Sequence, residues 1–506
     1  MAYNLLSGPV LLLALSAALL YCVLPRDSRR SKLPLPPGPR KLPIIGNLMD
    51  IHGKRIWEAC MDWSRNYNSD IIHLNLGGTS FVVLSSLETT EDLLEKRGSI
   101  YSDRPAFPMY DLMDWTFILG LRSQRRLFNQ HLNINASHSF KPQERAAAHS
   151  LLRRLLQTPD DYLQHLHLLP ADTIIPATYG LDIQPLDDPY VHLAERTFHY
   201  INLAVSGRFL VDFLPFLRYI PEWVPGTEFQ KIARETRKLS RDLRNVPFEA
   251  TKRQMVSGTS RPSFTANCLR DLETGKRYYD ETTVKEVAAV MYAAGVDTTA
   301  NVLATFFLAM LANPRAQKKA QAEIDATISQ GCLPDFDDAL PYVDALVKEV
   351  LRWAPVLPFG IPHLVQVEDE YRGYRIPANS TVVGNSWSVA ILHDEKVYPD
   401  PFTFKPERFL LEAKPNPSVP DPQAAFGFGR RVCPGKHLAS STLWITIASV
   451  LAVFEITKKV GEDGAVIEPL YEWEHRIVSA PVPFECDIRP RSESAARLVR
   501  STSGEV

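Results

Sequence analysis

Cys433 stands in a short segment rich in glycine and arginine, directly before a long apolar run that predicts a buried helix. The unpaired N–H groups at a helix start, together with Arg430 and Arg431, make the local potential positive and favour the thiolate. Gly429 and Gly435 would let the backbone adopt positive φ angles and approach a flat partner closely. Such a thiolate can serve as a nucleophile, a redox sensor or a metal ligand. A buried structural cysteine in a glycine-rich turn is the alternative.

A second candidate group lies in a long apolar segment, Glu281–Asn313, which contains no proline and predicts a helix of roughly 50 Å. Asp297 is the one charged residue in its central part, and a buried carboxylate is costly unless it has a partner or a function. Thr298 follows it, one turn from the small residues Ala294 and Gly295, which would open space beside the threonine hydroxyl. This pair is a candidate for moving protons, or a polar patch in a core helix.

Phe426, Gly429, Arg431, Cys433 and Gly435 together form the pattern Phe-x-x-Gly-x-Arg-x-Cys-x-Gly. This pattern resembles the haem-binding loop of the cytochrome P-450 family. The resemblance implies that Cys433 is the metal ligand, an axial thiolate on the iron of haem b, and that the other four residues help bind this cofactor.

Further motifs of the same family follow the family order along the chain. Asp297 and Thr298 match its acid–alcohol pair, which implies catalytic roles in delivering protons and in holding oxygen or water. Glu349 and Arg352 form a Glu-x-x-Arg pattern, and Arg408 lies in a later Pro-Glu-Arg-Phe segment. The resemblance implies that these three residues form a buried charge network that braces the haem loop, which is tolerable only if every charge is paired.

The segment that should bind the haem propionates departs from the family pattern. Arg125 matches the arginine of Trp-x-x-x-Arg, but Leu121 stands where the tryptophan is expected, and the approach through Phe117–Gly120 is several residues short. His363 occupies a place where relatives carry a propionate-binding Arg or His. Arg125 and His363 are therefore candidate cofactor-binding residues, with a solvated or incidental polar role as the alternative for each.

Composition limits the classes of function that remain. The 506 residues include 56 Lys and Arg and 58 Asp and Glu, so the net charge is −2, which gives no electrostatic support for binding nucleic acid. The 6 cysteines form no CxxC pair or regular framework. Their spacing argues against structural zinc and a disulfide scaffold, and it indicates a reducing compartment.

The N-terminal residues 1–25 carry no charge, and their apolar part, Leu5–Leu24, would span roughly 30 Å as a helix. Basic residues follow this stretch and none precede it, which favours a retained transmembrane anchor over a cleaved signal peptide, with the remaining chain facing the cytoplasm. The basic, proline-rich residues 26–43 would form a semi-rigid linker. Residues 44–488 would form one large catalytic domain, and the polar residues 489–506 a disordered tail.

The apolar periodicity predicts a mainly α fold with small β-sheets. The expected elements are a hairpin at Ile71–Leu84, helices at Leu87–Arg97, 142–260, Arg315–Ser329 and Tyr342–Trp353, and strands within Tyr371–Val383. Thr283 and Glu286 have capping-box spacing at the start of the long helix. The apolar stretch Phe209–Leu217 is assigned to the core, and the lip of a substrate channel at the membrane surface is the alternative.

The resemblance is to microsomal, fungal members of the family and implies a haem-thiolate monooxygenase of the endoplasmic reticulum membrane. Its substrate would be a small apolar molecule, a secondary metabolite or a xenobiotic, that contacts residues 101–120. No Gly-x-Gly-x-x-Gly fingerprint of a flavin or nicotinamide site is evident. Electrons must then come from an NADPH-dependent reductase, with cytochrome b5 as a further candidate donor. The alternatives are a reductase-independent isomerase or peroxygenase, and a haem-binding membrane protein with impaired turnover.

Overall fold

The computed structural model describes most of the chain after the N-terminal residues. The described ranges are residues 33–51, 55–119, 122–184, 188–205, 209–212, 214–275, 279–387, 392–474 and 478–504. The predicted transmembrane anchor, residues 1–25, and Leu121 lie outside these ranges.

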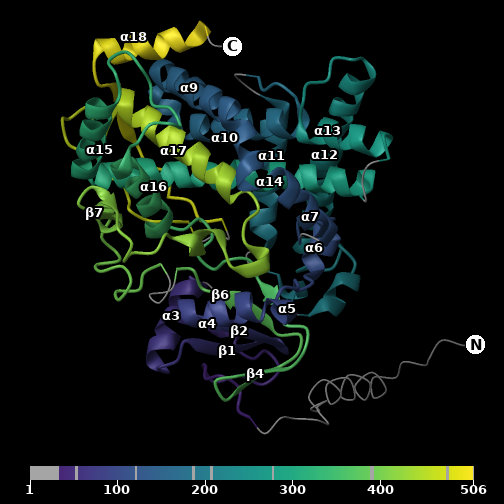
Figure 1. Ribbon diagram of the computed structural model, residues 1–506. Coiled ribbons are helices and arrows are strands. Elements are labelled where there is room, and N and C mark those ends of the chain that lie inside the picture. Colours follow the sequence, from purple (N-terminus) through teal and green to yellow (C-terminus); the bar gives the residue numbers. More distant parts are fainter. Residues whose placement is uncertain are drawn as a thin grey trace, which may run out of the picture.

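The fold is mainly helical with small sheets, as the sequence predicts, and Figure 1 shows a large helical part above a smaller part that contains β1, β2 and β6. The helices of the large part are α7 (Arg122–His131), α8 (Ile134–Ser137), α9 (Lys141–Gln157), α10 (Tyr162–Tyr179), α11 (Pro189–Val205), α12 (Glu228–Val256), α13 (Phe264–Glu273), α14 (Glu281–Ala312), α15 (Pro314–Thr327), α16 (Pro341–Trp353), α17 (Lys436–Val453) and α18 (Glu493–Ser501). Shorter helices precede them: α2 (Leu48–Ile51), α3 (Ile56–Asn66), α4 (Leu87–Thr90), α5 (Gly98–Tyr101) and α6 (Pro108–Leu112).

The main sheet has the strand order β1-β2-β6-β3. Its strands are β1 (Ile71–Leu76), β2 (Thr79–Leu84), β6 (Thr381–Gly384) and β3 (His363–Leu364). The predicted hairpin is confirmed, since β1 and β2 pair antiparallel around Gly77 and Gly78, both at positive φ. β2 then pairs parallel with β6, so strands from distant parts of the chain meet. Two-stranded sheets are formed by β4 (Asp369–Tyr371) with β5 (Tyr374–Ile376), β7 (Leu410–Leu411) with β8 (Lys414–Pro415), and β9 (Phe454–Lys458) with β10 (Cys486–Pro490).

The long helix α14 lies at the centre of the helical part (Figure 1) and confirms the predicted helix within one residue. Its cap differs from the prediction, because the Asp280 side chain accepts the N–H of Thr283 at 2.7 Å. Glu286 does not close a capping box. Its carboxylate instead accepts a hydrogen bond of 2.7 Å from Gln124 of α7, which ties α7 to α14.

Both α14 and α17 are long and apolar enough to cross a membrane by length and composition, but most of each apolar segment is buried inside the protein. They share one large hydrophobic cluster with α9, α10 and α16. Their apolar composition therefore reflects a position in the core, where a helix can be apolar on all sides.

Three predictions of local structure need correction. The tail is not disordered throughout, since Glu493–Ser501 forms α18, capped by Ser492, which buries Ala495, Ala496 and Val499. The predicted helix at Leu87–Arg97 consists of α4 and a π-helical turn at Glu91–Lys96, and α5 follows it from Gly98.

The apolar stretch Phe209–Leu217 is only partly core. Val211 is buried and Phe209 packs on the core, whereas Leu210 and Phe216 are exposed. The nearby Tyr219 is exposed as well. The sequence pattern could not separate these two faces because the stretch forms short 3-10 turns, which lack a regular repeat.

Candidate active site

The Cys433 loop is shaped by two glycines at positive φ. Gly427 and Gly429 have φ values of +82° and +55°, which L side chains rarely adopt. A Cβ atom at Gly429 would lie 2.2 Å from the carbonyl oxygen of Leu94, so the loop packs directly on the backbone of the π-helical turn. The N–H of Cys433 donates to the carbonyl of Phe426 at 2.8 Å, which closes the loop.

Gly435 has a different role from the one that the sequence suggested. Its φ is −86°, and it is the N-cap of α17, so positive φ is not the reason for a glycine there. A Cβ atom at this position would lie 4.0 Å from the sulfur of Cys433. The missing side chain keeps the space beside the sulfur open.

The thiol of Cys433 is half-buried, and burial raises its pKa above the ordinary value. The backbone N–H of Gly435 and the charges of Arg125 and Lys436 lower the pKa but do not outweigh burial. The expectation that the protein's own positive potential favours the thiolate is therefore wrong. A bound metal cation would supply the missing charge, since a coordinating thiol is deprotonated.

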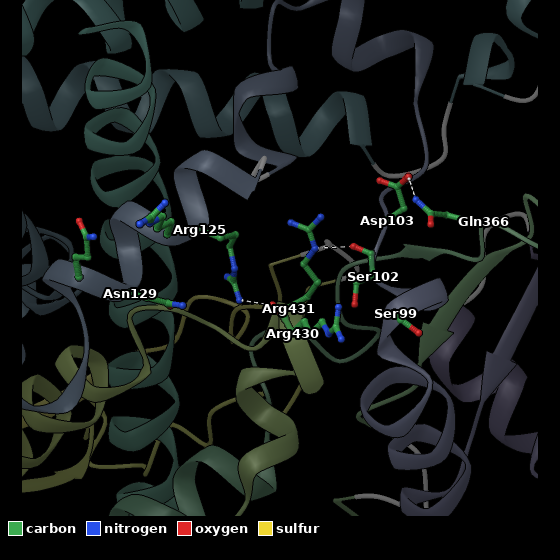
Figure 2. A pocket seen from close by; sticks show the side chains of 10 residues that line it. Ser99, Ser102, Asp103, Arg125, Asn129, Gln366, Arg430 and Arg431 are labelled. Carbon is green, nitrogen blue, oxygen red and sulfur yellow. Dashed lines mark hydrogen bonds between the residues drawn. The ribbon is translucent and has the colours of Figure 1, made fainter. Parts of the chain in front are cut away.

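Arg125, which was predicted to bind the cofactor, lies next to the cysteine loop. Its guanidinium donates to the carbonyls of Arg430 at 2.8 Å and Val432 at 2.7 Å, and Figure 2 shows it pointing towards the loop from α7. Arg126, the next residue, is exposed and is the solvated residue of the two. The packing at Leu121 lies outside the described residues.

Arg104 joins this region although no sequence motif marks it. Its guanidinium donates to the carbonyls of Ile361 at 2.9 Å and Pro362 at 2.6 Å. Burial and the charges of Arg431 and Arg125 lower its pKa to about 9. The only signal in the sequence was its position in the loop 101–120.

We call Arg104, Arg125 and Arg431 the arginine cluster. The charge of Arg431 also lowers the pKa of Arg125, so these cations repel one another while they donate to backbone carbonyls. Arg431 donates to the carbonyl of Ser102 at 2.6 Å. A dianionic group would relieve this repulsion, and the two propionates of haem have the matching charge. The residues present therefore fit that cofactor.

A pocket of about 800 Å³ lies at the outer side of the arginine cluster. Figure 2 shows that Arg125, Arg430 and Arg431 line it together, beside Ser102 and with Asp103 at its far side. Anionic groups are therefore favoured there, since basic side chains dominate the lining.

His363 lies beside the arginine cluster, but its neutral side chain is not set up to donate a hydrogen bond to a propionate. It is buried, and its Nδ1 is 2.9 Å from the carbonyl oxygen of Tyr101. Burial and the charges of Arg104 and Arg431 lower its pKa to about 3. The neutral ring that donates from Nδ1 leaves Nε2 as an acceptor, so His363 would donate to a propionate only after protonation.

The central part of α14 contains a window, which we define as Ala294, Gly295, Asp297 and Thr298. These are the residues of Val287–Leu311 that are not buried. This break in burial means that packed side chains do not fully cover the middle of an otherwise buried helix. The two predicted catalytic residues therefore lie together at one opening.

The hydroxyl of Thr298 donates to the carbonyl of Ala294 at 2.8 Å, which confirms the predicted bond to the residue four positions earlier. Ala294 is exposed and provides the open space. Gly295 provides close packing instead, because a Cβ atom there would lie 2.9 Å from the Ile174 side chain of α10.

The predicted charge network is present and buried. Glu349 accepts from Arg352 at 2.7 and 2.8 Å, in a bidentate pair, and from Arg408 at 3.2 and 3.1 Å. The other guanidinium nitrogens of these two arginines donate to backbone carbonyls. Arg352 donates to that of Leu392, and Arg408 donates to those of Pro399, Asp400 and Thr403. The network ties α16 to the segment that precedes the cysteine loop.

Comparisons with known proteins agree with this geometry. A family profile described as Cytochrome P450 matches residues 36–485. The chain is 42% identical to cytochrome P450 monooxygenase ple1 of Rhodocybe pseudopiperita, over 97% of this chain and 96% of that protein. It is equally, 42%, identical to cytochrome P450 monooxygenase 98 of Postia placenta, over 97% and 96% of the two chains.

Tryptamine 4-monooxygenase of Psilocybe cyanescens is 38% identical, over 96% of this chain and 98% of that protein. The profile and these relatives extend over nearly the whole chain, and the cysteine loop and the α14 window carry sequence motifs of this family. The chain belongs to the cytochrome P450 family of monooxygenases, oxidoreductases that carry haem b on an axial cysteine thiolate.

Proposed function

We propose that this protein inserts one oxygen atom from O2 into a small, largely apolar organic molecule, using electrons from an NADPH-dependent reductase. The observation that carries this proposal is the combination of the Cys433 loop with the α14 window. The window keeps both the acid and the alcohol, Asp297 and Thr298, at an opening in a buried helix. Reductase-independent relatives often lack that pair, so its presence favours oxygen activation with delivered protons.

The chain's own residues would hold the haem from two sides. Cys433 would bind the iron, and Phe426, Gly429 and Gly435 would shape the loop around it. The arginine cluster would bind the propionates through charge-assisted hydrogen bonds. The haem, when bound, activates molecular oxygen, and electron donation from the thiolate favours O–O cleavage.

Thr298 and Asp297 would manage protons on the opposite side. The Thr298 hydroxyl donates to a helix carbonyl in this structure, and rotation about χ1 would let it donate towards the opening instead. Asp297 precedes it in the window and is likewise half-buried. A carboxylate there can accept a proton from water and release it inward.

The substrate class is supported by the relatives. They include a tryptamine 4-monooxygenase. We propose a fungal secondary metabolite as substrate. A panel of terpenoids, indoles, steroids and polycyclic aromatics, screened for spectral binding shifts, would identify the class.

We further propose that residues 1–25 anchor the protein in the endoplasmic reticulum membrane and that the catalytic domain faces the cytoplasm. The uncharged apolar stretch followed by basic residues supports this orientation. A reductase in the same membrane, with cytochrome b5 as an additional donor, would then reach the Cys433 side of the domain.

The proposed function is tested by product formation in vesicles that contain the full-length protein. Products that require both NADPH and a flavoprotein reductase are the expected result. Products formed with added peroxide but not with NADPH and reductase would contradict the proposal. A purified protein that binds no haem after reconstitution would contradict it as well.

A further inference from the structure

Glu144 is a fully buried carboxyl group between α9 and α17, the helix that follows the cysteine loop. The hydroxyl of Ser441 donates to its Oε1 at 2.6 Å, and that of Thr442 donates to the same oxygen at 3.3 Å. No motif singles out Glu144, and neither the charge network nor the arginine cluster includes it.

The other oxygen, Oε2, is buried without a hydrogen-bond partner among the described residues. Lys141, one turn earlier on α9, is the charged group that acts on Glu144, but its ammonium lies over the ring of Phe336, 4.8 Å from the centroid. From α17, burial and Lys436 lower the pKa of His437, so this ring brings no stable positive charge. Burial raises the pKa of Glu144 to about 7 and outweighs the hydrogen bonds from Ser441 and Thr442, which lower it, so the neutral acid is the main form below pH 7.

This contact lies close to the residue that would hold the haem iron. α17 begins at Lys436, three positions after Cys433, and Ser441 lies roughly 8 Å further along the helix at the standard rise. The α9–α17 interface also has a large apolar part, and apolar contact has no preferred direction. Its members include Ala147 and Leu151 from α9 and Leu443 and Ile447 from α17. The hydrogen bonds to Glu144 therefore help to fix how α17 is rotated and where along its axis it sits, together with the hydrogen bond of 2.6 Å from Trp444 of α17 to Asp344 of α16.

We propose that Glu144 is a positioning residue for Cys433, whose neutral carboxyl group holds the start of α17 and whose ionisation releases it. The proposal rests on Cys433 being the haem ligand, as proposed above. An ionised Glu144 is a buried charge without a hydrogen-bonded cation, so water must enter or α17 must shift to relieve it. Either change moves the sulfur, because only the N-cap residue and its neighbour separate Cys433 from the helix.

The experiment uses the haem-loaded full chain and the band of its reduced carbon monoxide complex. The measured quantity is the rate at which the thiolate-ligated form converts to the thiol-ligated form. From one unit below to one unit above a pKa of about 7, the ionised share rises from about a tenth to about nine tenths. We expect the wild-type rate to rise about tenfold over this interval and the Glu144→Gln rate to stay constant.

Glu144→Met removes the charge without adding an amide and provides a second variant if Glu144→Gln does not load haem; its rate should also be independent of pH. Glu323→Gln is the matched control. Burial raises the pKa of Glu323 too, but it accepts from backbone N–H groups of Tyr342 and Val343 at the start of α16. This control should keep the wild-type pH dependence.

A wild-type rate that does not change with pH would overturn the proposal, and so would an unchanged pH dependence in Glu144→Gln. Loss of the pH dependence in Glu323→Gln would overturn it as well, since the effect would then be global. Absence of any thiolate-ligated band in the wild type is a distinct result. It would overturn the haem-ligand assignment of Cys433 and this inference with it.

Discussion

Two clusters of charge in this protein are compensated in opposite ways. Glu349 receives hydrogen bonds from both Arg352 and Arg408, and the remaining guanidinium groups donate to backbone carbonyls. In the arginine cluster, by contrast, the charges of Arg431 and Arg125 lower the pKa of Arg104. In the first cluster a carboxylate of the chain itself compensates the arginines, whereas the second cluster brings together like charges.

The difference indicates what each cluster does. A buried network that satisfies all its partners serves the folded structure, since breaking it leaves unpaired charge. A group of cations that repel one another costs stability in the haem-free chain and is explained by an anionic ligand. The comparison of the two clusters therefore distinguishes residues that stabilise the fold from residues that bind the cofactor.

The largest expected effect is that of Glu349→Leu, which leaves two buried guanidinium groups without their carboxylate. We expect the free energy of unfolding to fall by about 3–5 kcal/mol, measured by urea denaturation of the haem-free protein. Glu368→Gln, which removes a partly exposed ion pair with Arg375, should cost about 1 kcal/mol or less. Equal losses in the two variants would contradict the assigned role of the network.

Arg104→Met should separate cofactor binding from stability. Loss of a charge-assisted hydrogen bond should weaken haem binding by about 1.5–3 kcal/mol, tenfold or more, in a haem titration. The haem-free protein should lose less than about 1 kcal/mol of unfolding free energy, because relief of repulsion offsets the lost carbonyl contacts. Arg126→Met, at an exposed neighbour of Arg125, is the control and should change neither quantity. A stability loss as large as the loss in binding would contradict the comparison.

The loss of stability at low pH should distinguish the two clusters, because a buried histidine lies beside each of them: His363 beside the arginine cluster and His393 beside the Glu349 network. Burial and nearby arginines lower the pKa of both His363 and His393 from 6.5 to about 3. Because the folded state keeps these rings neutral, each contributes stability above pH 6.5 that is lost as the pH falls towards the folded pKa, by about 1.4 kcal/mol per unit.

Haem propionates would raise the pKa of His363 but not that of His393, which lies beside Arg352. His363→Gln should therefore reduce the acid sensitivity of the urea midpoint in the haem-free protein and have less effect once haem is bound. His393→Gln should reduce the acid sensitivity of the urea midpoint equally in the haem-free and the haem-bound protein. The same behaviour of the two variants would contradict a dianion at the arginine cluster.

The smallest effect on stability is expected for Thr298→Ala in the α14 window. The lost hydroxyl bonds its own helix, so unfolding free energy should change by less than about 1 kcal/mol. The product formed per NADPH consumed should fall severalfold, and Thr298→Ser should restore it. Unchanged coupling in Thr298→Ala would remove this residue from the proposed proton path.

Much of this site could be predicted from the sequence, because the residues of each motif lie close together along the chain. The cysteine loop and the α14 helix were predicted from residue type and spacing, and the Glu349 network was implied by the resemblance to the family. Arg104 could not be found in this way. Its role depends on Ile361 and Pro362, more than 250 positions away.

Other predictions were wrong where one residue type can adopt several backbone conformations. Gly429 has the predicted positive φ, but Gly435 is a helix cap at negative φ and Gly427 is the second residue at positive φ, a choice that residue identity does not make. The composition of residues 489–506 predicted disorder, yet α18 buries three small side chains against neighbouring elements. Burial of the Cys433 thiol also outweighed the positive charges that the sequence shows.

The parallel pairing of β2 with β6 has a consequence for how the chain is made. Val82 pairs with Val382, so the hairpin formed by β1 and β2 leaves the ribosome about 300 residues before its partner strand. At synthesis rates of about 5–20 residues per second, β2 waits roughly 15 to 60 seconds with an unpaired edge. An unpaired strand edge is a template for pairing with another chain, so this interval is when the nascent chain is most exposed to strand-to-strand aggregation.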